Sequence, residues 1–141
     1  MTKDELKLRT KKFALIVIKL INELPNSKAG NAIGNQLIRS GTSVASNYRA
    51  SCRARSSADF VSKTTVVEEE CDESLLWLEL ITESGLLCNE LTKKAMAEAN
   101  ELTAIFTAAG KTTKEKINNN KNKSKSSKNN LQLGPSPNKR R

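Results

Sequence analysis

Four segments of this chain repeat apolar residues every three or four positions, and only short links separate them. Such spacing places the apolar side chains on one face of an α-helix. The four predicted helices cover residues 4–24, 28–53, 57–84 and 89–116. The links between them cover residues 25–27, 54–56 and 85–88. Because links this short make consecutive helices antiparallel neighbours, the sequence predicts an all-α protein with an up-down-up-down four-helix bundle.

The predicted helix boundaries rest on residues that cap or stop helices. Thr2 and Glu5 have the spacing of a capping box at the start of the first helix. Pro25 ends that helix, because the residue before a proline disfavours the helical backbone. Ser27 is a favourable N-cap for the second helix. Gly85 suits the position just after the end of the third.

The first helix carries more apolar residues than one bundle seam can bury. Its core-facing stripe contains Leu6, Phe13, Val17, Leu20 and Leu24. Leu15, Ile16, Ile18 and Ile21 are apolar as well. A helix that is apolar nearly all round is buried on more than one side. In a chain of 141 residues, the second side is expected to meet another subunit. The second helix has a simpler stripe, in which Leu37 is a predicted core residue.

The end of the chain has a different composition from the rest. Residues 117–141 consist mainly of Lys, Asn, Ser, Gly and Pro, and they contain no acidic residue. Such a segment cannot bury enough apolar surface to offset the entropy lost on ordering. The sequence therefore predicts two regions, a four-helix bundle over residues 1–116 and a disordered basic tail over residues 117–141.

Several function classes are disfavoured by residues that the chain lacks. It has no histidine, and so lacks the commonest general base and the commonest transition-metal ligand. Cys52, Cys71 and Cys88 match no metal-binding or disulfide spacing, which favours reduced thiols. No apolar run approaches the roughly 20 residues that span a bilayer, and the first residues lack a signal-peptide core. We expect a cytoplasmic protein that is not an enzyme, with no cofactor, metal or membrane partner.

Charge is strongly segregated along the chain. Residues 1–63 contain 12 Lys and Arg against 4 Asp and Glu, whereas residues 64–110 contain 2 against 10. Residues 111–141 contain 10 Lys and Arg against Glu115 alone. The predicted bundle is therefore dipolar, which suits self-association through faces of opposite charge. The basic tail suits nucleic acid.

Four arginines, three in the second helix and one just after it, are the sharpest candidate for a binding surface. On a helical wheel Arg49 and Arg53 lie about 40° apart, and Arg39 lies within about 80° of both. Arg55 follows in the adjoining link. Arginines among short polar side chains are typical of phosphate contacts. The alternative is that they pair with acidic residues of the third helix, within or between subunits, and both interpretations can hold in an oligomer.

The tail supplies a second set of candidate nucleic-acid-binding residues. These are Lys121, Lys123, Lys125, Lys128, Lys139, Arg140 and Arg141. The acidic cluster at residues 68–73 is interpreted differently. Consecutive residues point around a helix, so few of these carboxylates share a face. We interpret the cluster as a solvated or interface-lining surface rather than a metal site.

Two runs of sequence carry a resemblance to a known family. Residues 34–50 read GNQLIRSGTSVASNYRA, with a Gln-Leu-x-Arg-Ser and a Ser-x-x-x-Asn pattern. Residues 56–60 read SSADF, residues 68–73 read EEECDE, and residues 76–80 read LWLEL. Over residues 4–110 the chain resembles the bacterial four helix bundle protein family. That family includes proteins encoded in intervening sequences of large-subunit ribosomal RNA and the accessory variability determinant of diversity-generating retroelements.

The resemblance implies a four-helix bundle that assembles into a ring-like homopentamer. It also implies binding of RNA or DNA and association with a reverse transcriptase during mutagenic copying. Our leading hypothesis is a non-enzymatic, oligomeric nucleic-acid-binding or scaffold protein, accessory to a reverse transcriptase. The alternative is a structural oligomeric bundle that recruits a protein partner and has no nucleic-acid role.

Overall fold

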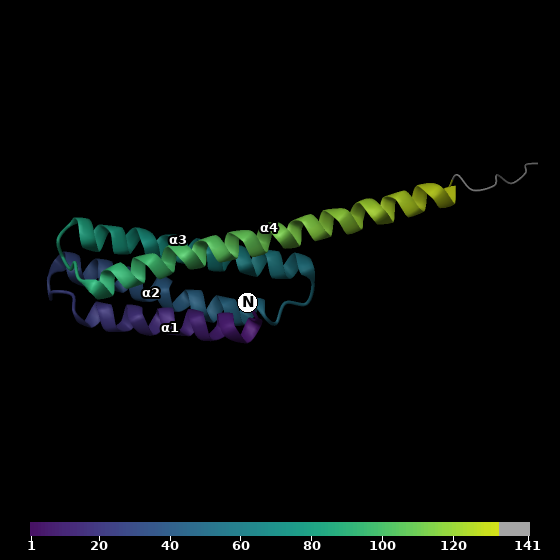
Figure 1. The fold of residues 1–141 in the computed structure, drawn as a ribbon. Coiled ribbons are helices and arrows are strands. Elements are labelled where there is room, and N and C mark those ends of the chain that lie inside the picture. Colours follow the sequence, from purple (N-terminus) through teal and green to yellow (C-terminus); the bar gives the residue numbers. More distant parts are fainter. Residues whose placement is uncertain (133–141) are drawn as a thin grey trace, which may run out of the picture.

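The protein folds into four α-helices joined by short turns, as seen in the computed structural model of Figure 1. The structure describes residues 1–132, with side chains through residue 128. The helices are α1 (Lys3–Asn22), α2 (Lys28–Ser51), α3 (Ser57–Glu83) and α4 (Glu90–Gln132). This part of the chain contains no β-strand. None of its helices combines the length and the apolar character needed to cross a membrane.

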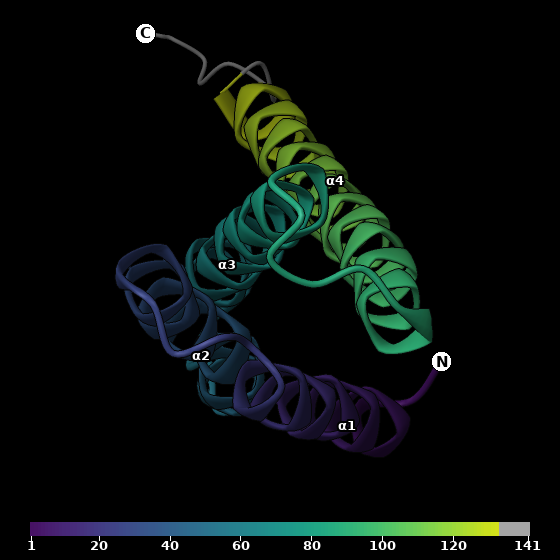
Figure 2. The same cartoon turned by 90° about the vertical axis from the view of Figure 1, so that its left-hand side faces the viewer.

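The helices occupy the four corners of a bundle, as the view along its axis shows (Figure 2). Each helix packs against the next one in sequence, and α1 also contacts α4. The backbones of the diagonal pairs, α1 with α3 and α2 with α4, lie farther apart, and Tyr48 of α2 meets Phe106 of α4 across the core with ring centroids 5.3 Å apart. Consecutive helices therefore run antiparallel around the bundle. The predicted all-α, up-down-up-down four-helix bundle is confirmed.

The caps that the sequence predicts are present. Thr2 Oγ1 accepts a hydrogen bond from the Glu5 backbone N–H, and a Glu5 carboxylate oxygen accepts one from the Thr2 N–H. The Ser27 hydroxyl oxygen accepts from the Gly30 N–H at 3.0 Å. Gly85 follows α3 with φ +79°, a left-handed conformation that favours glycine. The first three helices end within two residues of their predicted ends.

The core is mostly aliphatic, with three aromatic side chains, Phe13, Tyr48 and Phe106, and it is continuous along the bundle. Leu37 is fully buried, as are Phe13, Val17 and Leu20 of the predicted α1 stripe. The largest fully buried apolar side chains are Phe13, Phe106, Leu20, Leu37, Leu78, Ile81 and Leu102. Cys71 lies among them, and its burial raises the pKa of its thiol to about 12. Cys88, by contrast, is exposed.

Polar contacts fix how neighbouring helices align. On α1, Arg9 donates to both carboxylate oxygens of Glu98 on α4, at 2.7 and 2.9 Å. Such a two-pronged pair has a fixed geometry. Between α2 and α3, the buried Ser74 hydroxyl donates to Ser40 Oγ at 2.8 Å. Because buried polar groups are costly when unpaired, this bond disfavours a shift of α2 along α3.

Gly41 allows α1 and α2 to approach closely. A Cβ atom at this position would lie 2.9 Å from Val17 Cγ2. Gly110 of α4 has no neighbouring atom within 4 Å of the equivalent position. Alanine is favoured over glycine within a helix by about 1 kcal/mol, but overpacking a core costs about 1–3 kcal/mol. Both glycines thus occupy helices, and only Gly41 has a steric reason to be there.

These two glycines make a matched pair for a stability measurement. Gly110→Ala should raise the free energy of unfolding by up to about 1 kcal/mol. Gly41→Ala should lower it, because displacing the stiff Val17 side chain outweighs the gain in helix propensity. Urea unfolding followed by circular dichroism measures both. If both variants gained the same free energy of unfolding, α1 and α2 would not be held as close together at Gly41 as the structure shows.

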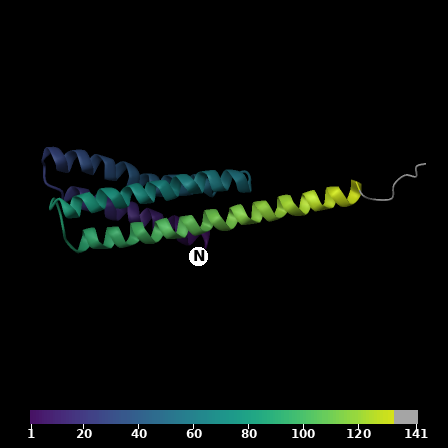
Figure 3. The ribbon, with the colours of Figure 1, turned by 90° about the horizontal axis from the view of Figure 1, so that it is seen from above.

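The fourth helix differs from the sequence prediction at its end. It was expected to stop near Lys116, and it continues to Gln132. Extending an existing helix requires no new nucleation, so Lys, Asn and Ser residues can follow the helix that the bundle starts. As predicted, this stretch buries almost nothing, and it projects beyond the other helices (Figure 3). Residues 133–141, which include Lys139, Arg140 and Arg141, lie outside the described part.

Candidate nucleic-acid interface

Arg39 does not belong to a free basic surface in this structure. Its guanidinium forms ion pairs across to α3, with Glu70 at 3.2 Å and with Glu73. Glu73 also accepts a hydrogen bond from the Trp77 indole N–H at 3.2 Å. The alternative interpretation, in which the arginines pair with acidic residues of the third helix, therefore holds for Arg39, and the pairing lies within one subunit. The acidic cluster includes the two carboxylates that hold it.

Arg49, Arg53 and Arg55 are placed differently. All three are exposed, and among the described residues no carboxylate forms an ion pair with their side chains. Arg53 and Arg55 line a surface hollow of about 490 Å³ where the α2–α3 turn meets α3. Arg49 and Arg53 line an adjoining hollow of about 290 Å³ along α2. The structure therefore brings these three predicted residues together along one groove.

Lys63 completes the hollow at the α2–α3 turn. It lies one turn along α3 from Asp59, and its ammonium contacts the Asp59 carboxylate at 2.7 Å. The Lys63 side chain, and then the Arg55 backbone N–H, hold the pKa of Asp59 below its ordinary value. The hollow thus contains Arg53, Arg55 and Lys63 against one carboxylate. It keeps a net positive charge at neutral pH and suits an anion.

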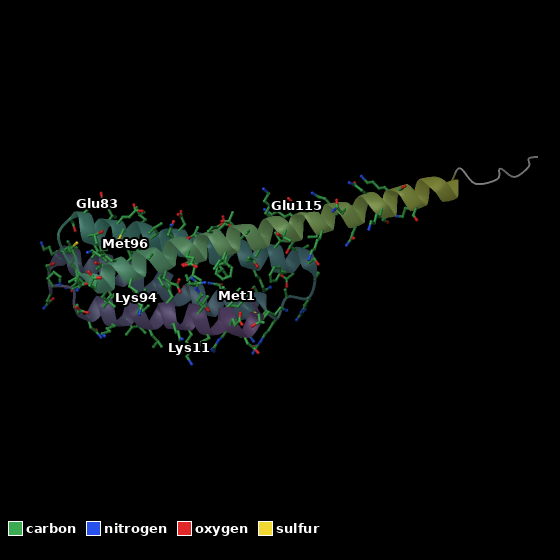
Figure 4. All side chains as sticks on the ribbon, viewed as in Figure 1. Met1, Lys11, Glu83, Lys94, Met96 and Glu115 are labelled. Atoms are coloured by element: carbon green, nitrogen blue, oxygen red, sulfur yellow. The ribbon has the colours of Figure 1, made fainter. Side chains whose placement is uncertain are left out.

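The same surface extends to residues that the sequence analysis did not single out. A third hollow, about 340 Å³, joins Lys11 of α1 to Arg49. A fourth, about 360 Å³, lies on the other side of the α2–α3 turn and is lined by Lys3, Arg55 and Lys116 among others. Figure 4 shows Lys11 pointing outward from α1, away from the other helices. No motif marks these lysines, because only the fold places them beside the arginines.

The basic groove ends where α4 leaves the bundle. The chain start and the α2–α3 turn lie at that end, and the projecting part of α4 continues from it (Figure 1). The predicted lysines Lys121, Lys123, Lys125 and Lys128 are exposed on that projection. The two candidate sets are therefore adjacent in space. Arginine and lysine side chains that lie near one another in this way can contact different phosphates of one nucleic-acid backbone.

The comparisons with known proteins agree with the fold. The family model described as 23S rRNA-intervening sequence protein matches residues 4–108. A crystal structure of a protein with unknown function from the S23 ribosomal protein family of Bacteroides thetaiotaomicron superposes with a TM-score of 0.71 at 27% sequence identity. The match covers 79% of this chain and 99% of that one. No curated protein matches the chain. The family match extends over α1, α2, α3 and the bundled part of α4, and so the chain belongs to the 23S rRNA-intervening sequence protein family.

Proposed function

We propose that this protein is a non-enzymatic scaffold that assembles into a homo-oligomer and binds nucleic acid. The observation that carries the nucleic-acid part is the groove lined by Arg49, Arg53 and Arg55, whose guanidinium groups face solvent without carboxylate partners in the described chain. The observation that supports an oligomer is a pair of exposed helix faces, both partly apolar, that carry opposite charge.

The first of these faces lies on α1. Leu8, Leu15 and Ile18 are 52%, 55% and 40% exposed, on the side of α1 that faces away from the core. Lys12 and Lys19 lie on the same side at helical spacing and are exposed too. We call this the α1 face. It combines apolar side chains with positive charge.

The second face lies on α3, and we call it the α3 face. Val66, Leu76 and Leu80 are 39%, 48% and 41% exposed. Glu69 and Asp72 lie among them and are also exposed. This face combines apolar side chains with negative charge. It therefore complements the α1 face in both properties.

The bundle keeps the two faces apart, because α1 and α3 occupy diagonal corners. An α1 face can therefore meet the α3 face of a second copy without displacing any helix. A contact between unlike faces repeats from copy to copy and closes into a ring when the rotation permits. The family resemblance implies five subunits. A ring would repeat the basic groove, so that weak phosphate contacts add through multivalency.

A reverse transcriptase is the protein partner that the same resemblance implies, and we include it in the proposal. Co-purification from cells that express both proteins measures this association. Retention of the reverse transcriptase by the full chain in buffer with nuclease would support direct contact. Loss of the complex under nuclease would mean that nucleic acid alone bridges the two proteins.

The proposed groove gives a clear expectation for arginine variants. Arg53→Gln with Arg55→Gln should lower affinity for a short single-stranded RNA about 25-fold at 0.1 M salt, because each lost phosphate contact with a single strand removes a factor of about 5 there. The steepness of the plot of log affinity against log salt should fall by about 1.4. Filter-binding titrations at several salt concentrations measure both quantities.

Arg39→Gln is the matched control on the same helix. Its guanidinium is already paired with Glu70 and Glu73, so affinity and salt slope should stay close to those of the unmodified protein. Oligomer size must be measured on the same samples, since arginines that pair with a neighbouring subunit would act indirectly. If Arg39→Gln and the double variant lose equal affinity for RNA, the phosphate contacts do not lie in the proposed groove. If the unmodified protein binds no RNA, the alternative function, a scaffold that recruits a protein partner, takes the place of nucleic-acid binding.

A further inference from the structure

The projecting part of α4 is a helix without a partner in the bundle. Every side chain from Asn118 to Lys128 is exposed, so this stretch is open on all sides. In Figures 1 and 3 it continues the axis of α4 well past the ends of the other helices. An isolated helix gains nothing from burial, so contacts with a ligand would add to its stability.

The seven lysines of residues 111–128, which lead into and include this projection, are not evenly distributed around α4. At 100° per residue, five of them fall within an arc of about 100°. These five are Lys111, Lys114, Lys121, Lys125 and Lys128. We call them the lysine stripe. The other two lysines, Lys116 and Lys123, lie on the opposite side of the helix, roughly 160° or more from the centre of the stripe. The stripe runs for about 26 Å along the axis at 1.5 Å per residue.

The stripe places like charges where they repel. Lys121 and Lys125 are four residues apart, and Lys125 and Lys128 are three apart, spacings at which like charges destabilise a helix. Glu115 is the only acidic residue between 111 and 128, and it lies outside the arc. A ligand with negative charges at regular intervals over about 26 Å would remove this repulsion. A nucleic-acid backbone has that charge pattern.

The width of a single α-helix favours a DNA duplex over an RNA duplex as the ligand. An α-helix with its side chains is about 10–12 Å wide, and the major groove of B-form DNA is about 12 Å wide. The major groove of A-form RNA is deep and narrow, so a helix does not enter it. Asn118 lies within the arc of the stripe, and asparagine is the side chain that pairs with the major-groove edge of adenine.

We infer that residues 111–128 of α4 are a duplex-DNA-binding helix that lies in the major groove with the lysine stripe facing the DNA. This inference rests on the proposed nucleic-acid-binding function and names its partner and mode. The basic groove at the α2–α3 turn lies beside the base of this helix, since Lys116 shares a hollow with Arg55. Lys116 lies on the side of α4 opposite the lysine stripe, so the proposed contact of the stripe with DNA is separate from the basic groove.

The test uses the full chain and three probes of one sequence: a 24-base-pair DNA duplex, the corresponding RNA duplex and the single DNA strand. The DNA duplex should bind at least about 10-fold more tightly than the RNA duplex, because only its major groove admits the helix. Adding it should also increase the helical circular dichroism signal, because phosphates relieve the lysine repulsion. Fluorescence anisotropy at 0.1 M salt measures the affinities.

Charge-matched variants separate the stripe from general basicity. Lys121→Gln with Lys125→Gln should lower affinity for the DNA duplex about 60-fold at 0.1 M salt, as expected for two lost phosphate contacts. Lys123→Gln removes a charge from the opposite side of the helix, outside the basic groove, and should lower affinity less than about 3-fold, since only long-range attraction changes. Lys125→Gln alone is its charge-matched counterpart on the stripe and should lower affinity about 8-fold.

Failure of this inference is distinguishable from failure of the proposed function. If the three probes bind with equal affinity and the stripe and control variants lose equal affinity, the lysines act only through their total positive charge and not through their position on the helix. The inference is then overturned while nucleic-acid binding stands. If none of the probes binds, the proposed function fails with it. The stripe could instead bind an acidic protein surface, such as the α3 face of another copy. In that case the variant with Lys121→Gln and Lys125→Gln would no longer form the oligomer, and this result would also overturn the inference.

Discussion

Leu37→Ala should lower the free energy of unfolding by about 2–5 kcal/mol. Leu37 is fully buried at the centre of the α2 stripe, where it belongs to the core cluster. Removing its side chain forfeits the transfer free energy of the lost methyl groups and leaves a cavity that close-packed helices cannot fill. Since a typical domain is stable by only about 5–15 kcal/mol, the loss is a large share of the total.

Ile38→Ala is the control, because Ile38 is the next residue and is 37% exposed. Its loss should stay below about 1.5 kcal/mol, since much of that side chain is already in contact with water. Urea unfolding should show a lower midpoint with an unchanged m-value for both variants. If the two variants were equally stable, α2 would be rotated relative to the orientation described.

Reversing the charge of the α1 face should convert the oligomer into monomers. In Lys12→Glu with Lys19→Glu, an acidic face would meet the acidic α3 face of the next copy. Like charges brought together at an interface cost several kcal/mol, enough to lower the association constant by more than about a thousandfold. Light scattering coupled to size-exclusion chromatography measures the mass directly.

A charge swap shows whether the α3 face is the partner. Adding Glu69→Lys and Asp72→Lys to the α1 variant restores opposite signs, and it should restore the oligomer. The α3 substitutions alone should break it as the α1 substitutions do. If the swapped chain stays monomeric while remaining helical, the two faces do not meet. If the α1 variant keeps its full size, the ring is built through other surfaces.

The bundle was predictable from sequence because its determinants are local. Apolar spacing set the helix phase, Thr2 and Ser27 marked helix starts, and Pro25 and Gly85 marked ends. The length of α4 was not predictable in this way. Composition alone predicted disorder after Lys116, whereas helix continuation depends on the preceding turns being held by the bundle.

The candidate interface was only partly predictable, because pairing across helices is not encoded in local spacing. A helical wheel groups Arg39 with Arg49 and Arg53. Only the packing of α2 on α3 brings Glu70 and Glu73 within reach of Arg39 and leaves the other two without such partners. Lys63 and Lys11 join the groove for the same reason. Their contribution depends on the α2–α3 turn and on the contact between α1 and α2.

We expect one assembly both to oligomerise and to bind nucleic acid through phosphate contacts. The most direct measurement is a titration of the full chain with labelled single-stranded RNA and duplex DNA at salt concentrations from about 50 to 200 mM. Light scattering is done on the same samples. The account predicts an oligomer at micromolar protein whose affinity for at least one probe falls steeply and linearly on a log–log plot against salt. A monomer, or an oligomer that retains neither probe at about 50 mM salt, where phosphate contacts are strong, would contradict it.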